Sequence, residues 1–220
     1  PNDIYSYSAL ACIAIQANQN DQHGGQSIVN FDYGLAPGVA KTYKKLYLVN
    51  LKKAAEILAP SRELSLRDFK TMAAEIEAVS GLKPQLGGNA EYEKLELAKL
   101  TALLGYEDSA RQAQAFAIKN TEGETDHSTY QAMEALIHNL NTMHSRAGAQ
   151  TPFSSINYGM DTTPEGRMVI KNVLLATEAG LGHGETPIFP IHIFRVKEGI
   201  NYNPGEPNYD LFQLACRVSA

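Results

Sequence analysis

Residues 151–196 carry the pattern that most restricts the fold of this chain: a strand, a helix and a second strand in close succession. Residues 151–158 predict the first strand, and residues 188–196 predict the second. Between them, Pro164 lies in the first turn of a helix that ends at Gly180. Two strands joined through a helix are expected to lie parallel in one sheet, with a right-handed crossover. The segment therefore predicts an α/β fold.

The chain before this unit is predicted to be mostly helical. Residues 6–20 predict a buried helix that ends before two consecutive glycines, and residues 26–31 predict a short strand. Pro37 is expected to open a second helix, because proline is favoured in the first turn. This helix has an apolar stripe and is expected to end at Pro60.

Residues 61–120 differ from the rest in being rich in Ala, Leu, Glu and Lys and in lacking a strand signal. Ser65 and Asp68 have the spacing of a capping box, which predicts a helix start. The chain is accordingly divided into residues 1–60, a helical insertion at 61–120, and residues 121–220. Further helices are expected at residues 65–81, 91–104, 107–118, 126–146 and 209–218.

The charge balance restricts the partners. The chain has 19 Lys and Arg against 24 Asp and Glu, a formal net charge of −5. Nucleic-acid and membrane surfaces need clustered cations, so we expect neither partner. Cys12 and Cys216 are both expected on buried helix faces, and without a CxxC pair or a histidine cluster we expect no metal site. This cysteine usage favours a reducing cytoplasm. Because the chain begins at Pro1 and ends within a predicted helix, we expect a segment of a longer protein.

The stretch His23-Gly24-Gly25-Gln26-Ser27 is a candidate for ligand contact. Its glycines allow the backbone to approach a ligand closely, and Gln26 and Ser27 supply donors. The alternative interpretation is a helix C-cap followed by a tight turn.

The predicted strand at 151–158 is a second candidate, because it carries polar side chains on both faces. Thr151, Ser155 and Asn157 share one face, whereas Ser154 lies on the other. Buried polar groups need partners, so this strand suggests a cavity lined for a ligand. A solvated edge strand is the alternative.

Two further places are suited to anions. Residues 159–167 join a strand end to a helix start, where α/β proteins bind anions. There Arg167 either faces a phosphate or carboxylate, or pairs with Glu165 or Asp161. The second helix carries a group of lysines that indicates a solvated face or a small phosphate site. These are Lys41, Lys44, Lys45, Lys52 and Lys53.

Three long stretches, residues 18–39, 130–167 and 184–216, resemble the catalytic core of the anaerobic (class III) ribonucleoside-triphosphate reductases. The first contains NQNDQHGGQSIVNFDYG and the second TPFSSINYGMDTTPEGR. The resemblance implies part of the ten-stranded α/β barrel shared by ribonucleotide reductases and pyruvate formate-lyase, with an α-helical insertion. It implies an oxygen-sensitive glycyl-radical enzyme of deoxyribonucleotide biosynthesis and DNA replication.

The resemblance also implies site residues. His23, Gly24, Gly25, Gln26 and Ser27 resemble a barrel segment beside the ribonucleoside triphosphate substrate. The strand residues Gln150, Thr151, Ser154 and Asn157 resemble another such segment. Lys44 and Lys45 lie on a helix similar to the homodimer-interface helix, where a lysine contacts the allosteric dNTP effector.

The radical machinery of such an enzyme is expected elsewhere. The family's thiyl cysteine, glycyl-radical loop and four-cysteine zinc site have no counterpart among the motifs of this chain, so we expect the segment alone to be inactive. A parent enzyme would bind ATP and dNTP effectors and be activated by a radical S-adenosylmethionine activase. The alternatives are a non-catalytic nucleotide-binding or dimerisation module, and a fragment of a pyruvate formate-lyase-like enzyme.

Overall fold

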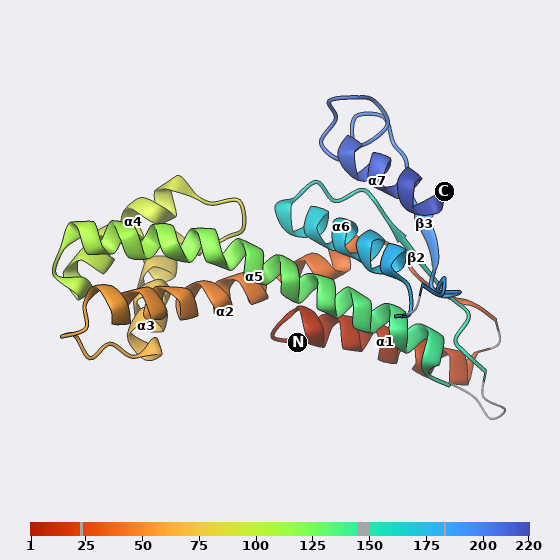
Figure 1. Cartoon of the computed structure of the whole chain (residues 1–220), viewed down its shortest axis with the longest axis horizontal. Coiled ribbons are helices and arrows are strands. Elements are labelled where there is room, and N and C mark those ends of the chain that lie inside the picture. The colour runs from red at the N-terminus through yellow and green to blue at the C-terminus, as the bar shows by residue number, and fades with distance from the viewer. Residues whose placement is uncertain (23, 145–149, 183) are drawn as a thin grey trace. The chain divides into compact units, whose positions relative to one another are not determined.

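The computed structural model describes residues 1–22, 24–144, 150–182 and 184–220, and it is mostly helical with one small sheet (Figure 1). The chain divides into two compact units, which are described separately: residues 1–39 with 126–220, and residues 40–125. The elements are α1 (Ile4–Asp21), β1 (Gln26–Ile28), α2 (Phe31–Leu58), α3 (Leu66–Ser80), α4 (Ala90–Leu104), α5 (Glu107–Thr142), β2 (Ser154–Tyr158), α6 (Pro164–Ala179), β3 (Ile191–Phe194) and α7 (Tyr209–Ser219). The described part of the chain contains no helix long and apolar enough to cross a membrane.

The sheet of the first unit has the strand order β1-β2-β3, and both neighbouring pairs are parallel. Gln26 lies opposite Ser154 in the first pair, and Ser155 lies opposite Ile191 in the second. The predicted strand, helix and parallel strand are therefore confirmed. The residues that the structure describes form a mixed α/β fold with a three-stranded sheet.

Helices cover one face of this sheet. In α6, eight of the sixteen residues are buried, so the helix is covered on more than one side. Its Asn172 amide donates to Asp126 of α5 at 2.8 Å, and α5 in turn contacts α1, where the Ser8 hydroxyl donates to the Ala132 carbonyl at 2.9 Å. These helices bury one side of β2, while the other side stays partly exposed.

The start of α2 differs from the prediction. The strand ends at Ile28, and the helix begins at Phe31 rather than at Pro37, which lies inside it. Asn30 adopts a positive φ of 53° and its carbonyl accepts from Gly34, so the turn between β1 and α2 is very short. Pro37 has no N–H to donate to the Tyr33 carbonyl, so α2 lacks one backbone hydrogen bond in its second turn but continues to Leu58.

The predicted helices at 107–118 and 126–146 are wrong as separate elements, because α5 is one helix of 36 residues. The intervening NTEGETD looks like a linker in sequence, but Thr121 and Thr125 are buried. They continue the stripe begun by Ala110, Ala113 and Ala117 at helical spacing. Burial of this stripe of small residues keeps the stretch helical, although no large apolar side chain indicates a helix there in the sequence.

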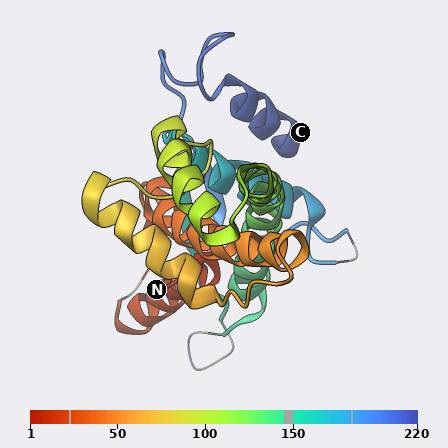
Figure 2. The ribbon, with the colours of Figure 1, turned by 90° about the vertical axis from the view of Figure 1, so that its left-hand side faces the viewer.

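The second unit consists of the later part of α2, α3, α4 and the first part of α5 (Figure 2). The predicted capping box at Ser65 and Asp68 is present. The buried carboxylate of Glu96 accepts from the hydroxyls of Tyr47 at 2.6 Å and Tyr92 at 2.9 Å, and from the Gln114 amide at 2.8 Å. Burial raises the pKa of Glu96, against the lowering effect of these three donors. The predicted insertion at 61–120 lies within this unit.

Candidate functional site

The partly exposed face of the sheet gathers polar side chains from two distant segments. Ser155 and Asn157 of β2 point to this face, because they alternate with the buried residues Ser154, Ile156 and Tyr158. The Ser27 hydroxyl of β1, 130 positions away from Asn157, donates to its Oδ1 at 3.1 Å. The parallel register of β1 and β2 therefore produces a polar pair that neither segment has alone. We call this the open face.

On the open face, the Asn157 amide group keeps a donor for a ligand. Its Oδ1 is used by Ser27, while Nδ2 donates to no residue that the structure describes. Ile191 and Ile193 of β3 are exposed beside it, with 56% and 42% of their surface accessible. A polar pair next to apolar side chains suits a ligand with both hydroxyl and flat apolar groups.

The other predicted substrate residues lie at the amino-terminal end of the same strands. The Gln26 backbone N–H donates to the Phe153 carbonyl at 2.8 Å. This bond extends the pairing of the two segments to the residue just before β2. Gly24 has a φ of +106°, a conformation that a residue with a Cβ rarely adopts. Gln150 is exposed and Thr151 half-buried, both just before β2. His23 lies outside the described residues.

Ser154 lies on the opposite face from Asn157 and is 3% exposed. Among the described residues, its Oγ has no hydrogen-bond partner. A ligand on the open face therefore does not meet its side chain directly.

At the carboxyl end of β2, residues 159–161 form a loop whose backbone N–H groups all point to one carboxylate. Oδ2 of Asp32, a fully buried residue, accepts from Gly159, Met160 and Asp161 at 2.9, 2.9 and 3.0 Å. Gly159 has a φ of +113°, and a Cβ there would lie 2.9 Å from the Arg195 carbonyl. Only glycine fits this position.

The three carbonyls of the 159–161 loop are satisfied as well. The first accepts from Asn201 at 2.9 Å and from Asn208 at 3.2 Å, the second from the Tyr33 hydroxyl at 3.0 Å, and the third from Asn208 at 2.9 Å. All six backbone polar groups of the loop are thus bonded to side chains. Sequence reasoning missed Asp32, Asn201 and Asn208, since no local motif marks a residue whose partners lie far along the chain.

The anion site predicted at residues 159–167 is occupied by the protein's own groups. Arg167 pairs with Asp210 at 2.7 Å, rather than with Glu165 or Asp161, and donates to Asn208 at 2.8 Å and to the Pro207 carbonyl. The start of α6 is capped by the Thr163 hydroxyl, which accepts from the Gly166 N–H at 3.1 Å. The arginine therefore anchors the start of α7 to α6.

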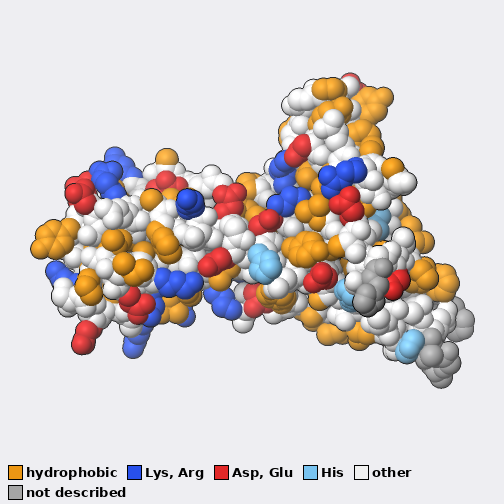
Figure 3. Space-filling model, in the orientation of Figure 1, with side chains coloured by type: hydrophobic (Ala, Val, Ile, Leu, Met, Phe, Trp, Pro, Cys, Tyr) orange, Lys and Arg blue, Asp and Glu red, His pale blue; other side chains and the backbone are white. Residues whose placement is uncertain are grey.

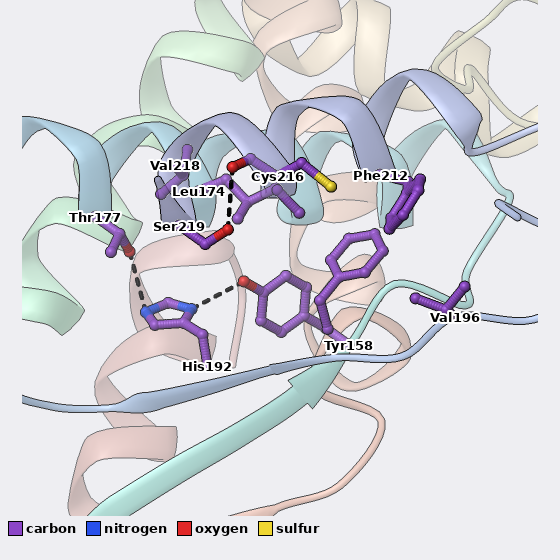
Figure 4. A pocket seen from close by; sticks show the side chains of 11 residues that line it. Tyr158, Leu174, Thr177, His192, Val196, Phe212, Cys216, Val218 and Ser219 are labelled. Carbon is purple, nitrogen blue, oxygen red and sulfur yellow. Dashed lines mark hydrogen bonds between the residues drawn. The ribbon is translucent and has the colours of Figure 1, made fainter.

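Behind the sheet, on the face opposite Asn157, a pocket of about 310 Å³ lies between β3, α6 and α7 (Figure 4). Its inner wall carries His192, whose Nδ1 is 2.9 Å from the Tyr158 hydroxyl and whose Nε2 is 3.1 Å from Thr177 Oγ1. Because Thr177 donates its own hydrogen to the Val173 carbonyl, Nε2 carries the proton and Nδ1 accepts from Tyr158. Burial lowers the pKa of His192 to about 4, so the imidazole is neutral near pH 7.

This pocket offers little to a nucleotide. Its remaining lining is largely apolar, and His192, Tyr158 and Thr177 already bond to one another. A charged phosphate would be desolvated there without a cation to meet it. The pocket also corrects the prediction for Cys216, which is exposed at its wall rather than buried, whereas Cys12 is buried as predicted and burial raises its pKa to about 11.

The lysines of α2 belong to the second unit and are largely engaged in ion pairs. Lys44 bonds Glu77 at 2.5 Å, Lys52 bonds Glu56 at 2.6 Å, and Lys53 lies 3.5 Å from Glu124. Lys45 is exposed. Acidic and basic side chains are interspersed over the face of this unit shown in Figure 3, so the lysines do not form a uniform positive surface there.

The described residues hold no group of three or more His, Cys, Asp or Glu side chains placed to bind a metal ion. Cys12 and Cys216 lie on α1 and α7. These two residues do not fit a four-cysteine zinc site, which needs four thiolates around one ion.

Comparisons with known proteins agree on one family. The family model described as anaerobic ribonucleoside-triphosphate reductase matches residues 1–220. The anaerobic ribonucleoside-triphosphate reductase of Escherichia coli K12 is 35% identical over 120 residues, which cover 52% of this chain and 17% of that protein. The enzyme of the same name from Enterobacteria phage T4 is 39% identical over 115 residues, covering 52% of this chain and 19% of that protein. The matched part is thus less than a fifth of either relative.

Proposed function

The chain belongs to the anaerobic ribonucleoside-triphosphate reductases, and from this premise we propose that it supplies a nucleotide-contacting face to a larger enzyme. That enzyme reduces ribonucleoside triphosphates to deoxyribonucleoside triphosphates. The observation that carries the proposal is the Ser27–Asn157 pair on the open face, bonded at 3.1 Å. An amide donor held by a neighbouring hydroxyl is suited to a ribose hydroxyl or a phosphate oxygen.

In this proposal the three parallel strands are part of a ten-stranded barrel whose interior is the open face. The exposed Ile191 and Ile193 support it, because exposed apolar residues on a sheet mark surfaces that pack against another element. Ser27 and Asn157 orient the substrate, and Gly24 and Gly25 let the backbone approach it. Gln26 lies opposite Ser154 in the register, so it acts through the backbone of β1 rather than by its side chain. Gln150 and Thr151 lie at the edge of the site, and Ser154 contributes only as part of the β2 backbone, since its side chain lies on the other face.

In this proposal, the radical chemistry belongs to parts of the enzyme outside this chain. In the larger enzyme, a glycyl radical generated by a radical S-adenosylmethionine activase would start nucleotide reduction. Neither Cys12 nor Cys216 has a role in that step, so the segment alone is inactive. A dNTP effector at a homodimer interface contacts Lys45, with Lys44 beside it held by Glu77. The enzyme acts in the cytoplasm.

Calorimetric titration of the chain with CTP, ATP and dNTPs tests the proposal. Asn157→Ala and Ser27→Ala should each weaken ribonucleotide binding about fivefold, since a lost hydrogen bond is worth about 1 kcal/mol. Asn120→Ala is the matched control, because its amide lies on α5 and bonds only the Phe116 carbonyl among described groups. Equal affinity in all three variants, or no binding by the folded chain, would reject the open face as the site.

A further inference from the structure

We propose that Asp32 is a positioning residue for the open face: its carboxylate sets where Asn157 lies relative to Ser27. The binding of substrate at the open face rests on the proposed function, but the position of Asp32 between the two strand ends does not. Asp32 lies five residues after Ser27, at the start of α2, and bonds the loop that begins two residues after Asn157. One side chain therefore joins the ends of the two strands that carry the pair.

The 159–161 loop needs such an anchor. Its three consecutive N–H groups converge on Oδ2 of Asp32 at 2.9–3.0 Å, which is a backbone nest of the kind that binds anions. Without a negative charge at its centre, three buried donors would be unsatisfied and their dipoles would repel one another. Asp32 is an anion built into the chain, and it replaces a free one.

The geometry separates Asp32 from the other partners of the loop. Asn201 and Asn208 bond the loop carbonyls from residues that follow β3, so they hold β2 against the carboxyl-terminal part of the unit. Tyr33 bonds the middle carbonyl from the same turn as Asp32. Only Asp32 and Tyr33, among the described partners of the loop, tie it to the segment that follows β1, and Asp32 supplies three of those four bonds.

The test uses the whole chain and a readout at Asn157 itself. In Asp32→Gly, the missing side chain has the shape and charge of acetate, so acetate can re-enter the nest. We expect the side-chain amide resonances of Asn157 to move in the nuclear magnetic resonance spectrum of this variant. Added acetate should return them toward their wild-type positions, and sodium chloride at equal ionic strength should not. Ribonucleotide affinity should fall about tenfold and recover with acetate.

Two further variants keep the result interpretable. Asp3→Gly also removes a carboxylate that accepts a backbone N–H, from Ser6 at 2.9 Å, but at the start of α1; it should leave the Asn157 resonances in place. Asp32→Asn keeps the shape of the side chain but removes its charge. If Asp32→Gly does not fold, the Asn157 resonances are measured in Asp32→Asn instead.

The proposal is overturned if Asn157 keeps its resonances in a folded Asp32 variant, or if acetate fails to restore them in folded Asp32→Gly. It is also overturned if neither variant folds, because Asp32 would then determine folding rather than position. A wild-type chain that binds no nucleotide would reject the proposed function alone, and the resonance shifts would still decide the role of Asp32.

Discussion

At the scale of single residues, His192 on the covered side of the sheet has its partners inside the protein, whereas Asn157 on the open face keeps a donor for a ligand. His192 shows the first case, bonded to Tyr158 on one side and Thr177 on the other. Asn157 shows the second, with one oxygen used and its amide nitrogen directed to the open face. The two faces of one sheet therefore have different chemical roles.

The lowered pKa of His192 predicts a pH-dependent stability. The pKa is about 4 in the folded chain against 6.5 for an unperturbed histidine, so between these values only the unfolded state binds the proton. Stability should be unaffected above pH 6.5 and fall as the pH drops toward 4, by about 2 to 3 kcal/mol. Urea unfolding at several pH values measures this. In His192→Gln the loss over this window should be smaller by that amount, and identical pH profiles would contradict the prediction.

In the second unit, the hydrogen bonds of Glu96 predict a loss of stability when its carboxylate is removed. It accepts from Tyr47, Tyr92 and Gln114, which lie on α2, α4 and α5, so one carboxylate links three helices. Glu96→Ala should lower the free energy of unfolding by about 3 kcal/mol or more, because two buried hydroxyls and one partly buried amide lose their acceptor. Glu93→Ala, one turn away on α4 and more exposed, is the control. Similar losses in both variants would show that the buried cluster is not what stabilises the unit.

At the scale of elements, the close approach of α1 and α2 depends on one glycine. A Cβ at Gly38 would lie 2.9 Å from the Tyr7 ring, whereas a Cβ at Gly34, one turn earlier on α2, would meet nothing within 4 Å. Gly38→Ala should therefore destabilise the chain by about 1–3 kcal/mol. Gly34→Ala should be neutral or stabilising by up to about 1 kcal/mol, because alanine favours helix. Thermal unfolding of the pair measures both effects, and equal melting temperatures would contradict the close packing.

The sequence predicted elements well where one local rule determined them. The capping box at Ser65 and the parallel β2-α6-β3 unit are present, because hydroxyl caps and apolar periods act within a few residues. The prediction failed where packing between residues far apart in the chain determines the helix bounds, as at the start of α2 and the middle of α5. At the candidate site it named Ser27 and Asn157 but missed Asp32, whose partners lie 127 to 129 positions away.

At the scale of the whole molecule, the exposed apolar side chains of β3 predict self-association of the chain. Ile191 and Ile193 lie on an edge strand, and an edge strand with exposed apolar residues pairs readily with another copy. Ile193→Lys should shift the chain toward monomer in sedimentation velocity experiments at raised concentration, without lowering its melting temperature. Val79→Lys, at a residue 90% exposed on α3, is the control. If both lysines act alike, net charge rather than the sheet governs association.

The parallel pairing of β1 with β2 has a consequence for folding. Ser27 and Asn157 meet across 130 positions, with the whole of the second unit lying between them in the chain. The entropy lost on closing so long a loop grows only logarithmically, by about 0.6 kcal/mol for each doubling of its length. Helical turns can thus be added to or removed from the intervening unit with little change in sheet stability. The folding rate is the sensitive quantity, because contacts of such high sequence separation form late.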